Sequence, residues 1–152
     1  MEYLVDTGVW LRLFDRSDPE HAAIRAALRS LRTNGHTMAA CPQNIAEFWN
    51  VSTRPASARG GYGKSVATTE LRVQFIERNA RVLDESAAAY RQWRELLGEH
   101  QIQGLAAHDA RLVSMMGVAG ISQILTLNVA DFARYPGIVA LAPKAVAAPL
   151  KP

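Results

Sequence analysis

Cysteine is nearly absent from this sequence, and it contains no long hydrophobic run. Cys41 is the single cysteine among 152 residues, so no internal disulfide can form and a reducing cytoplasm is the expected location. No apolar run approaches the ~20 residues of a membrane span. The N-terminus leads from Glu2 directly into an apolar stretch, without the basic start of a signal peptide. We therefore expect no membrane association.

The sequence also lacks a strong charge imbalance and paired histidines. The net charge is only +3, which is compatible with a polyanionic partner but does not require one. Most of the basic residues are arginines, whose planar fork fits phosphate, although a GC-rich genome produces the same bias. The four histidines have no spacing typical of a zinc site, and they stand at positions 21, 36, 100 and 108.

Short apolar stretches alternate with amphipathic segments along the chain. Strands are expected at 3–5, 36–40, 81–84, 121–127 and 138–143, and helices at 6–15, 18–35, 41–53, 68–79, 86–100 and 105–120. In the helix at 18–35, Asp18 is the expected cap and Gly35 the expected end. This alternation predicts an α/β fold in three layers, with a central, mainly parallel sheet flanked by helices. A single domain over 1–142 and a flexible tail over 143–152 are expected.

Acidic residues follow several of the expected strands. Asp6 comes directly after the apolar residues Tyr3, Leu4 and Val5. Open parallel sheets place their sites beyond the carboxyl ends of their strands, so Asp6 is a candidate site residue. The alternative is that Asp6 only caps the helix that follows, which aspartate does well.

Two further acids lie on helices that would pack against the sheet. Glu47 stands at the edge of the apolar face of the helix at 41–53, where it could instead be a solvated surface residue. Asp109 begins the helix at 105–120, where the helix dipole alone would favour an aspartate. After the strand at 121–127 come Asn128 and Asp131, which either belong to the same site or cap a turn.

The segments VDTGVWL, QNIAEFWNVSTRP, HDARLV and LTLNVADFARYPGI together resemble the PIN-domain nucleases, and especially the VapC-like toxins of bacterial toxin–antitoxin pairs. The resemblance covers nearly the whole chain in the right order and implies a PIN-like (Rossmann-like) fold. It implies cleavage of RNA with Mg²⁺ or Mn²⁺. It also implies an antitoxin protein as partner and a homodimer.

Within this resemblance, Asp6, Glu47 and Asp109 match the first three acids of the family, and these acids bind the metal. The fourth position is open between Asn128, which stands where many members have an acid, and Asp131, which matches a neighbouring acid. Oxygen ligands suit a hard cation such as Mg²⁺, independently of the family. The expected activity is metal-dependent hydrolysis of RNA, with Asp6 and Asp109 as principal ligands and Glu47 as ligand or base.

The loop RPASARGGYGKS contains a GKS sequence that resembles a phosphate-binding P-loop, but Ala58 stands where that pattern requires glycine. The loop is instead a candidate for RNA contacts through Arg54, Arg59, Tyr62 and Lys64. A solvated loop without function is the alternative. For the whole chain, the alternative to a nuclease is a catalytically inactive module with the same fold that binds RNA or protein.

Overall fold

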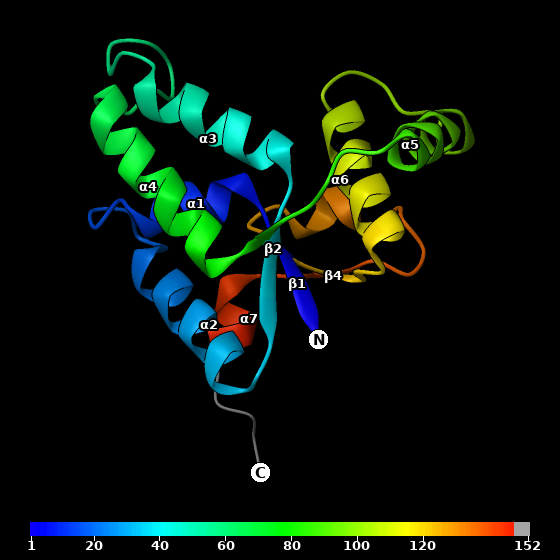
Figure 1. Ribbon diagram of the computed structural model, residues 1–152, viewed down its shortest axis with the longest axis horizontal. Helices are drawn as coiled ribbons and strands as arrows, with labels where there is room; N and C mark the ends of the chain where they lie inside the picture. Colours follow the sequence, from blue (N-terminus) through cyan, green and yellow to red (C-terminus); the bar gives the residue numbers. More distant parts are fainter. Residues whose placement is uncertain (148–152) are drawn as a thin grey trace.

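A five-stranded parallel sheet lies at the centre of the structure, which is a computed structural model describing residues 1–147 (Figure 1). The strand order is β3-β2-β1-β4-β5, and every neighbouring pair is parallel. This confirms the expected α/β class with three layers. The strands are β1 (Glu2–Val5), β2 (Thr37–Ala40), β3 (Arg81–Val82), β4 (Gln123–Leu125) and β5 (Val139–Leu141).

The strand order reverses beside β1. The next two strands along the chain, β2 and β3, lie on one side of β1, and the following strand, β4, lies on the other side. Tyr3 consequently lies between Met38 of β2 and Gln123 of β4. A parallel sheet opens a crevice at such a reversal, beyond the carboxyl ends of the two strands. The carboxyl ends of β1 and β4 therefore mark the place where a site is expected.

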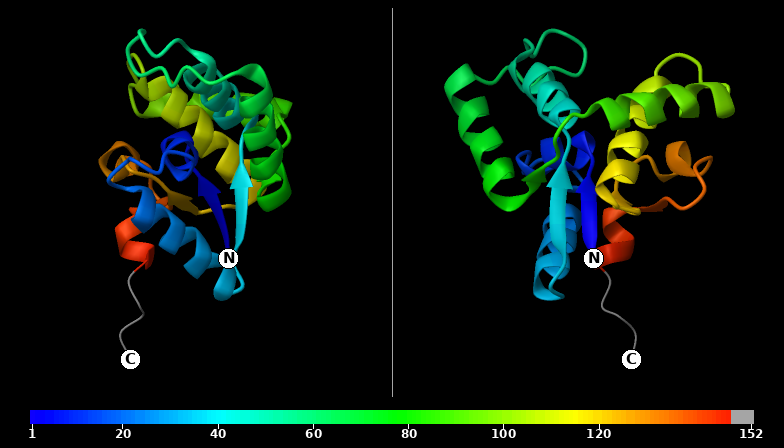
Figure 2. Two further views of the ribbon diagram at one scale, coloured as in Figure 1. Left: turned by 90° about the vertical axis from the view of Figure 1, so that its left-hand side faces the viewer. Right: turned by 45° about the vertical axis from the view of Figure 1, so that its right-hand side comes forward.

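Helices cover both faces of the sheet (Figure 2). The first face carries α1, α2, α3, α4 and α7, and the second carries α5, α6 and the short 3₁₀ helix η1. No helix within residues 1–147 combines the length and hydropathy that crossing a membrane requires. The helices are α1 (Thr7–Leu13), α2 (His21–Thr33), α3 (Pro42–Thr53), α4 (Val66–Asn79), α5 (Ala87–Glu99), α6 (Ala106–Ala119), η1 (Val129–Phe132) and α7 (Pro143–Ala147).

Alternating side chains of β1 fill two separate hydrophobic clusters. Tyr3 and Val5 belong to the cluster under α1 to α4, whereas Leu4 belongs to the cluster under α5 and α6. All three side chains are buried. This burial on both faces explains why consecutive residues of the strand are apolar, instead of alternating with polar ones. β1 is thereby fixed from both faces, and the residue that follows it is held at a defined position.

Helix α2 begins three residues later than the sequence indicates. Asp18 is not its N-cap; the Asp18 carboxylate accepts a hydrogen bond from the Glu20 N–H at 2.8 Å and pairs with Arg12 at 3.3 Å. These contacts hold residues 18–20 in a turn. The end of the helix is as expected, because Gly35 adopts a positive φ of 72° that other residues rarely adopt.

The segment 143–147, which we expected to be part of a flexible tail, forms the helix α7. Val146 and Ala147 pack against the cluster under α1 to α4, and Lys144 pairs with Glu20. Burial of these side chains on α2 explains why the helix forms despite its short length. The remainder of the expected tail, 148–152, lies outside the described residues.

Candidate active site

Asp6 stands between the end of β1 and the start of α1. Its Oδ1 accepts a hydrogen bond from the Thr7 N–H at 2.7 Å, which makes it the N-cap of α1. Its Oδ2 accepts a second bond, from the Thr126 hydroxyl, also at 2.7 Å. Thr126 directly follows β4, so this bond spans the strand reversal described above. Asp6 is therefore both a helix cap and the first acid of the crevice.

Burial raises the pKa of Asp6 above its ordinary value, because the charged carboxylate loses solvation. The hydrogen bonds from Thr126 and Thr7 act in the opposite direction, since they favour the charged form. The negative charges of Glu47 and Asp131 raise the pKa further. Two acids that are distant in sequence thus lie close enough to Asp6 to affect its ionisation.

Glu47 is fixed by a chain of hydrogen bonds at the start of α3. The Thr7 hydroxyl donates to Glu47 Oε2 at 2.8 Å, and Asn44 donates to that hydroxyl oxygen at 3.1 Å. Gln43 donates to Glu47 Oε1 at 2.9 Å. Glu47 is half-buried, and both of its oxygens are bonded, so it does not belong to a freely solvated outer face.

Asp109 lies in the first turn of α6 and is half-buried. The pKa of its carboxyl is raised to about 6, mainly by burial and then by the charges of Asp131, Asp6 and Glu47, while His108 acts in the opposite direction. Acids from three other segments of the chain therefore lie close enough to Asp109 to affect its ionisation. A pKa raised by neighbouring like charges is typical of functional carboxylates.

Asp131 and Asn128 differ in their relation to this group of acids. Asp131 lies in η1, and its charge raises the pKa of both Asp6 and Asp109. The backbone N–H of Asn128 donates to the Thr126 hydroxyl at 3.1 Å. The Asn128 backbone thus bonds to the same hydroxyl that donates to Asp6.

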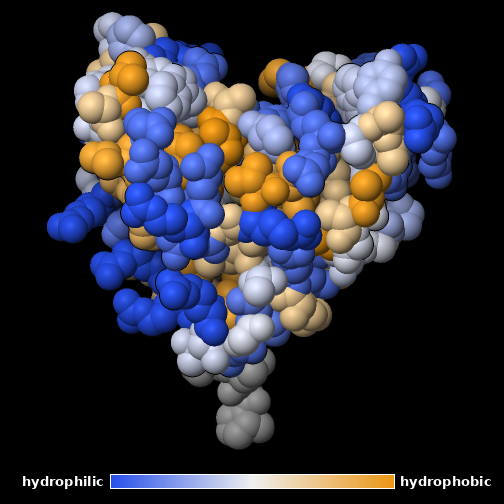
Figure 3. Space-filling view, viewed as in Figure 1, coloured by the Kyte–Doolittle hydropathy of each residue, from blue (hydrophilic) through white to orange (hydrophobic). Residues whose placement is uncertain are grey.

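Gln43 joins the two sides of the crevice. Its Nε2 donates to the backbone carbonyl of His108 at 3.2 Å as well as to Glu47, so the first turns of α3 and α6 are linked. Above this link, the surface is hollowed between the part formed by α3 and α4 and the part formed by α5 and α6 (Figure 3). The first turns of α3 and α6 therefore border this hollow.

The side chains of this site fit a hard divalent cation by their chemistry. Asp6, Glu47, Asp109 and Asp131 offer only oxygen ligands, which Mg²⁺ and Mn²⁺ prefer. Gln43 Oε1 is buried and has no hydrogen-bond partner among the described residues, so it could accept a bond from a water of such an ion. Within residues 1–147, however, no three carboxylate, imidazole or thiol side chains gather closely enough to enclose a metal.

The candidate RNA-contacting residues lie in the loop 54–65, at the opposite end of α3 from Gln43. Arg54 donates to the carbonyl of Arg59 at 2.9 Å, and the Tyr62 ring packs partly against the hydrophobic cluster under α1 to α4. Gly61 leaves no room for a side chain, because a Cβ there would lie 2.2 Å from the Pro55 carbonyl oxygen. Glu47, the acid on α3, stands seven residues before Arg54, which corresponds to about 10 Å along the helix.

Three polar residues of the site are missing from the sequence-based candidates: Gln43, Asn44 and Thr126. Asn44 and Thr126 are completely buried, and Gln43 is 8% exposed. All three stand near the carboxyl end of a strand. Thr126 directly follows β4, and Gln43 and Asn44 stand three and four residues after the end of β2. Polar residues there can hold acids in place, and such residues are detectable once the strands are assigned.

Several known proteins are similar to this chain. The PIN domain family matches residues 3–138. VapBC2 from Rickettsia felis, bound to a DNA fragment from its promoter, is similar with a TM-score of 0.67 and 17% identity over 93% of this chain and 98% of that one. A toxin–antitoxin complex from Klebsiella pneumoniae gives a TM-score of 0.63 and 16% identity over 93% and 97%.

A third solved structure is the sarcin-ricin loop cleaving toxin VapC20 from Mycobacterium tuberculosis. Its TM-score is 0.59 and its identity 20%, over 80% of this chain and 86% of that one. No curated protein sequence matches this chain. At these identities, the likeness to the solved structures concerns the fold alone.

We expect Asp109→Asn to stabilise the metal-free protein at pH 7. Because the folded-state pKa is raised from 3.8 to about 6, the wild type loses stability as the pH rises through this range, and the variant should not. The expected gain is about 1 kcal/mol, less than the full shift implies, since Asp109 is partly exposed and therefore screened. Urea unfolding in EDTA between pH 4 and 7 measures this. Equal pH dependence in both proteins would contradict it, and the exposed Asp84→Asn serves as the control.

We expect Thr126→Val to raise the pKa of Asp6 further, because the substitution removes a hydrogen bond that favours the ionised carboxylate. The unfolding free energy at pH 7 should fall by about 1–3 kcal/mol. The carboxyl ¹³C chemical shift of Asp6, followed against pH, measures the pKa. Thr126→Ser keeps the hydroxyl and should behave as the wild type. A Val variant with an unchanged titration would show that Thr126 does not govern Asp6.

Proposed function

This chain belongs to the PIN domain family, and from that premise we propose that it is a divalent-metal-dependent endoribonuclease, the toxin of a toxin–antitoxin pair. One observation carries the proposal: the charges of Glu47 and Asp131 raise the pKa of both Asp6 and Asp109, so these four acids lie close together although they come from four segments of the chain. Carboxylates in such proximity suit a metal-assisted attack on a phosphodiester.

Each acid has a proposed role. Asp6 and Asp109 would be the principal metal ligands, with Asp131 as the fourth acid and Glu47 as a ligand or, through a water, a base. Mg²⁺ or Mn²⁺ would supply charge that lowers the pKa of a bound water and offsets charge on the leaving oxygen. The chain's own contribution is orientation: Thr126 holds Asp6, and Thr7 and Gln43 hold Glu47.

The proposed partners follow from the family and from the similar proteins. An antitoxin protein is supported by the likeness to a toxin–antitoxin complex, and RNA by the likeness to a toxin that cleaves the sarcin-ricin loop. A homodimer is proposed from the family resemblance. A cytoplasmic location suits an RNA substrate and the buried free thiol of Cys41.

The loop 54–65 is proposed to contact the RNA backbone away from the bond that is cut. Arg59 and Lys64 are exposed, and Arg54 is held against the loop backbone. Because Tyr62 is partly buried against the core, charge rather than base stacking is the main contribution expected from this loop.

We expect Mn²⁺ to bind the wild type and not Asp6→Asn, because the substitution removes a central carboxylate. Calorimetric titration of Mn²⁺ into metal-free protein measures binding, and unfolding curves check that the variant folds. Asp84→Asn, which removes an exposed acid elsewhere, should bind as the wild type does. Absence of binding to folded wild-type protein would favour the alternative function, an inactive PIN-fold module that binds RNA or protein.

The same three proteins test the activity. Incubated with total bacterial RNA and Mn²⁺, the wild type and Asp84→Asn should generate new RNA ends that sequencing can map, and Asp6→Asn should not. EDTA should abolish the cleavage. Cleavage that continues in EDTA or in Asp6→Asn would contradict the proposal.

We expect Arg59→Ala to weaken RNA binding and to reduce its salt dependence by about one phosphate contact, because each contact releases counterions. Binding of a labelled single-stranded RNA to metal-free protein, measured at several salt concentrations, provides the slope. Arg29→Ala is a matched control, since Arg29 is exposed on α2, which lies at the other end of the structure from the loop (Figure 1). An unchanged slope in Arg59→Ala would place this residue outside the RNA interface.

A further inference from the structure

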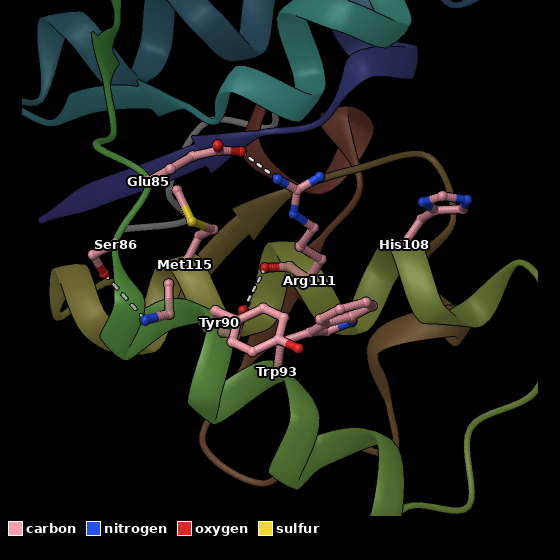
Figure 4. Close-up of a pocket in the computed structure, with 9 residues that line it drawn as sticks. Glu85, Ser86, Tyr90, Trp93, His108, Arg111 and Met115 are labelled. Carbon is pink, nitrogen blue, oxygen red and sulfur yellow. Dashed lines mark hydrogen bonds and ion pairs between the residues drawn. The ribbon is translucent and has the colours of Figure 1, made fainter.

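A cavity lies between α5 and α6 (Figure 4). Its volume is about 340 Å³, which is near the lower limit for small-ligand sites and suits one planar group rather than a large ligand. Two aromatic residues, Tyr90 and Trp93, line it together with Glu85, Arg111 and His108. Apart from His108, whose carbonyl accepts the Gln43 bond, none of these residues has a role in the nuclease site described above.

The two aromatic side chains form one side of the cavity, where Trp93 is held in place and Tyr90 is exposed. The Trp93 indole N–H donates to the carbonyl of Ala107 at 2.8 Å, which holds the ring against α6. The Tyr90 ring lies 6.1 Å from the Trp93 ring and is 56% exposed. An exposed aromatic ring beside a fixed one offers a planar group a surface for stacking.

The polar residues of the cavity are an ion pair. Arg111 donates to Glu85, and both side chains are about half exposed to solvent. An ion pair this exposed contributes little to stability. Arg111 and Glu85 can therefore each replace part of their mutual contact with hydrogen bonds to a ligand. Arg111 offers several N–H donors and Glu85 offers two acceptor oxygens.

The cavity and the nuclease site share the first turn of α6. His108, which lines the cavity, directly precedes Asp109, and Arg111 follows two residues later. The carbonyl of His108 also accepts the Gln43 bond that links α6 to α3. A molecule in this cavity would therefore lie next to the acids rather than at a remote surface.

We propose that this cavity binds one unpaired base of the RNA, adjacent to the bond that is cut, and that it prefers guanine. The proposal rests on the proposed function, because it assigns part of the recognition of the same substrate. Guanine alone among the bases presents two neighbouring acceptors, O6 and N7, to an arginine fork. Its neighbouring N–H groups can also donate to a single carboxylate such as Glu85.

The test uses metal-free wild-type protein and guanosine 5′-monophosphate, so that it requires no cleavage. The three tryptophan indole N–H signals in a ¹H–¹⁵N spectrum report the position of binding. The Trp93 signal, assigned with Trp93→Phe, should shift and saturate. The signals of Trp10 and Trp49 should remain in place, since both residues pack in the other hydrophobic cluster. The adenine, cytosine and uracil nucleotides should bind more weakly.

Variants test the individual contacts. Tyr90→Ala should weaken binding at least fivefold, as loss of a stacking partner does, and Arg111→Gln should weaken it similarly. Glu85→Gln should reduce the preference for guanine over adenine. Phe75→Ala and Arg91→Ala are matched controls, exposed and outside the cavity, and should bind as the wild type does. Thermal unfolding confirms that each variant is folded.

Several results would overturn the proposal. No movement of the Trp93 signal up to the solubility limit would exclude base binding. An equal shift with ribose 5-phosphate would mean that the cavity takes an anion. Equal affinity for all four nucleotides would remove the guanine preference. A Trp93 signal that depends on protein concentration without nucleotide would identify the cavity as a contact between copies of the chain. A protein that binds guanosine monophosphate but cuts no RNA would instead contradict the proposed nuclease function alone.

Discussion

The burial of the Asp6 carboxylate is the constraint on which the site depends. A carboxylate taken out of water is costly, and here the charges of Glu47 and Asp131 add to that cost. The hydrogen bonds from Thr7 and Thr126 offset part of it. Since Thr7 begins α1 and Thr126 follows β4, the strand reversal itself supplies the partners that Asp6 needs. The site is therefore a consequence of the strand order.

A second acid, Glu47, is held by polar residues at the start of helices. Asn44 is fully buried and connects the backbone N–H of Cys41 to the Thr7 hydroxyl, which in turn donates to Glu47. The same residues thus begin α3 and fix an acid. Stability and site geometry share one hydrogen-bond network, so substitutions in it should affect both.

The sequence predicts structure best where a short run of residues is enough to indicate the element that it forms. The apolar residues of β1 and the acid after them predicted both a buried strand and a site at its end, and the parallel sheet followed from the alternation of strands and helices. The Thr126 and Gln43 contacts were not predictable in this way, because each depends on a partner in another segment. Helix α7 is not predictable from its own residues, because five residues are too few to form a helix alone and packing on α2 decides it. Asp18 was assigned as a cap because its partner Arg12 cannot be recognised from spacing.

The bond between Asp6 and Thr126 joins residues that are 120 positions apart. Chains are made from the N-terminus, and a growing chain cannot close this contact before β4 has left the ribosome. Loop closure over such a distance is also slow and entropically costly. A nascent chain that ends before Thr126 lacks both the partner of Asp6 and the fourth acid. The complete group of acids therefore assembles only after Asp131 has left the ribosome, which delays any activity of this site until that point.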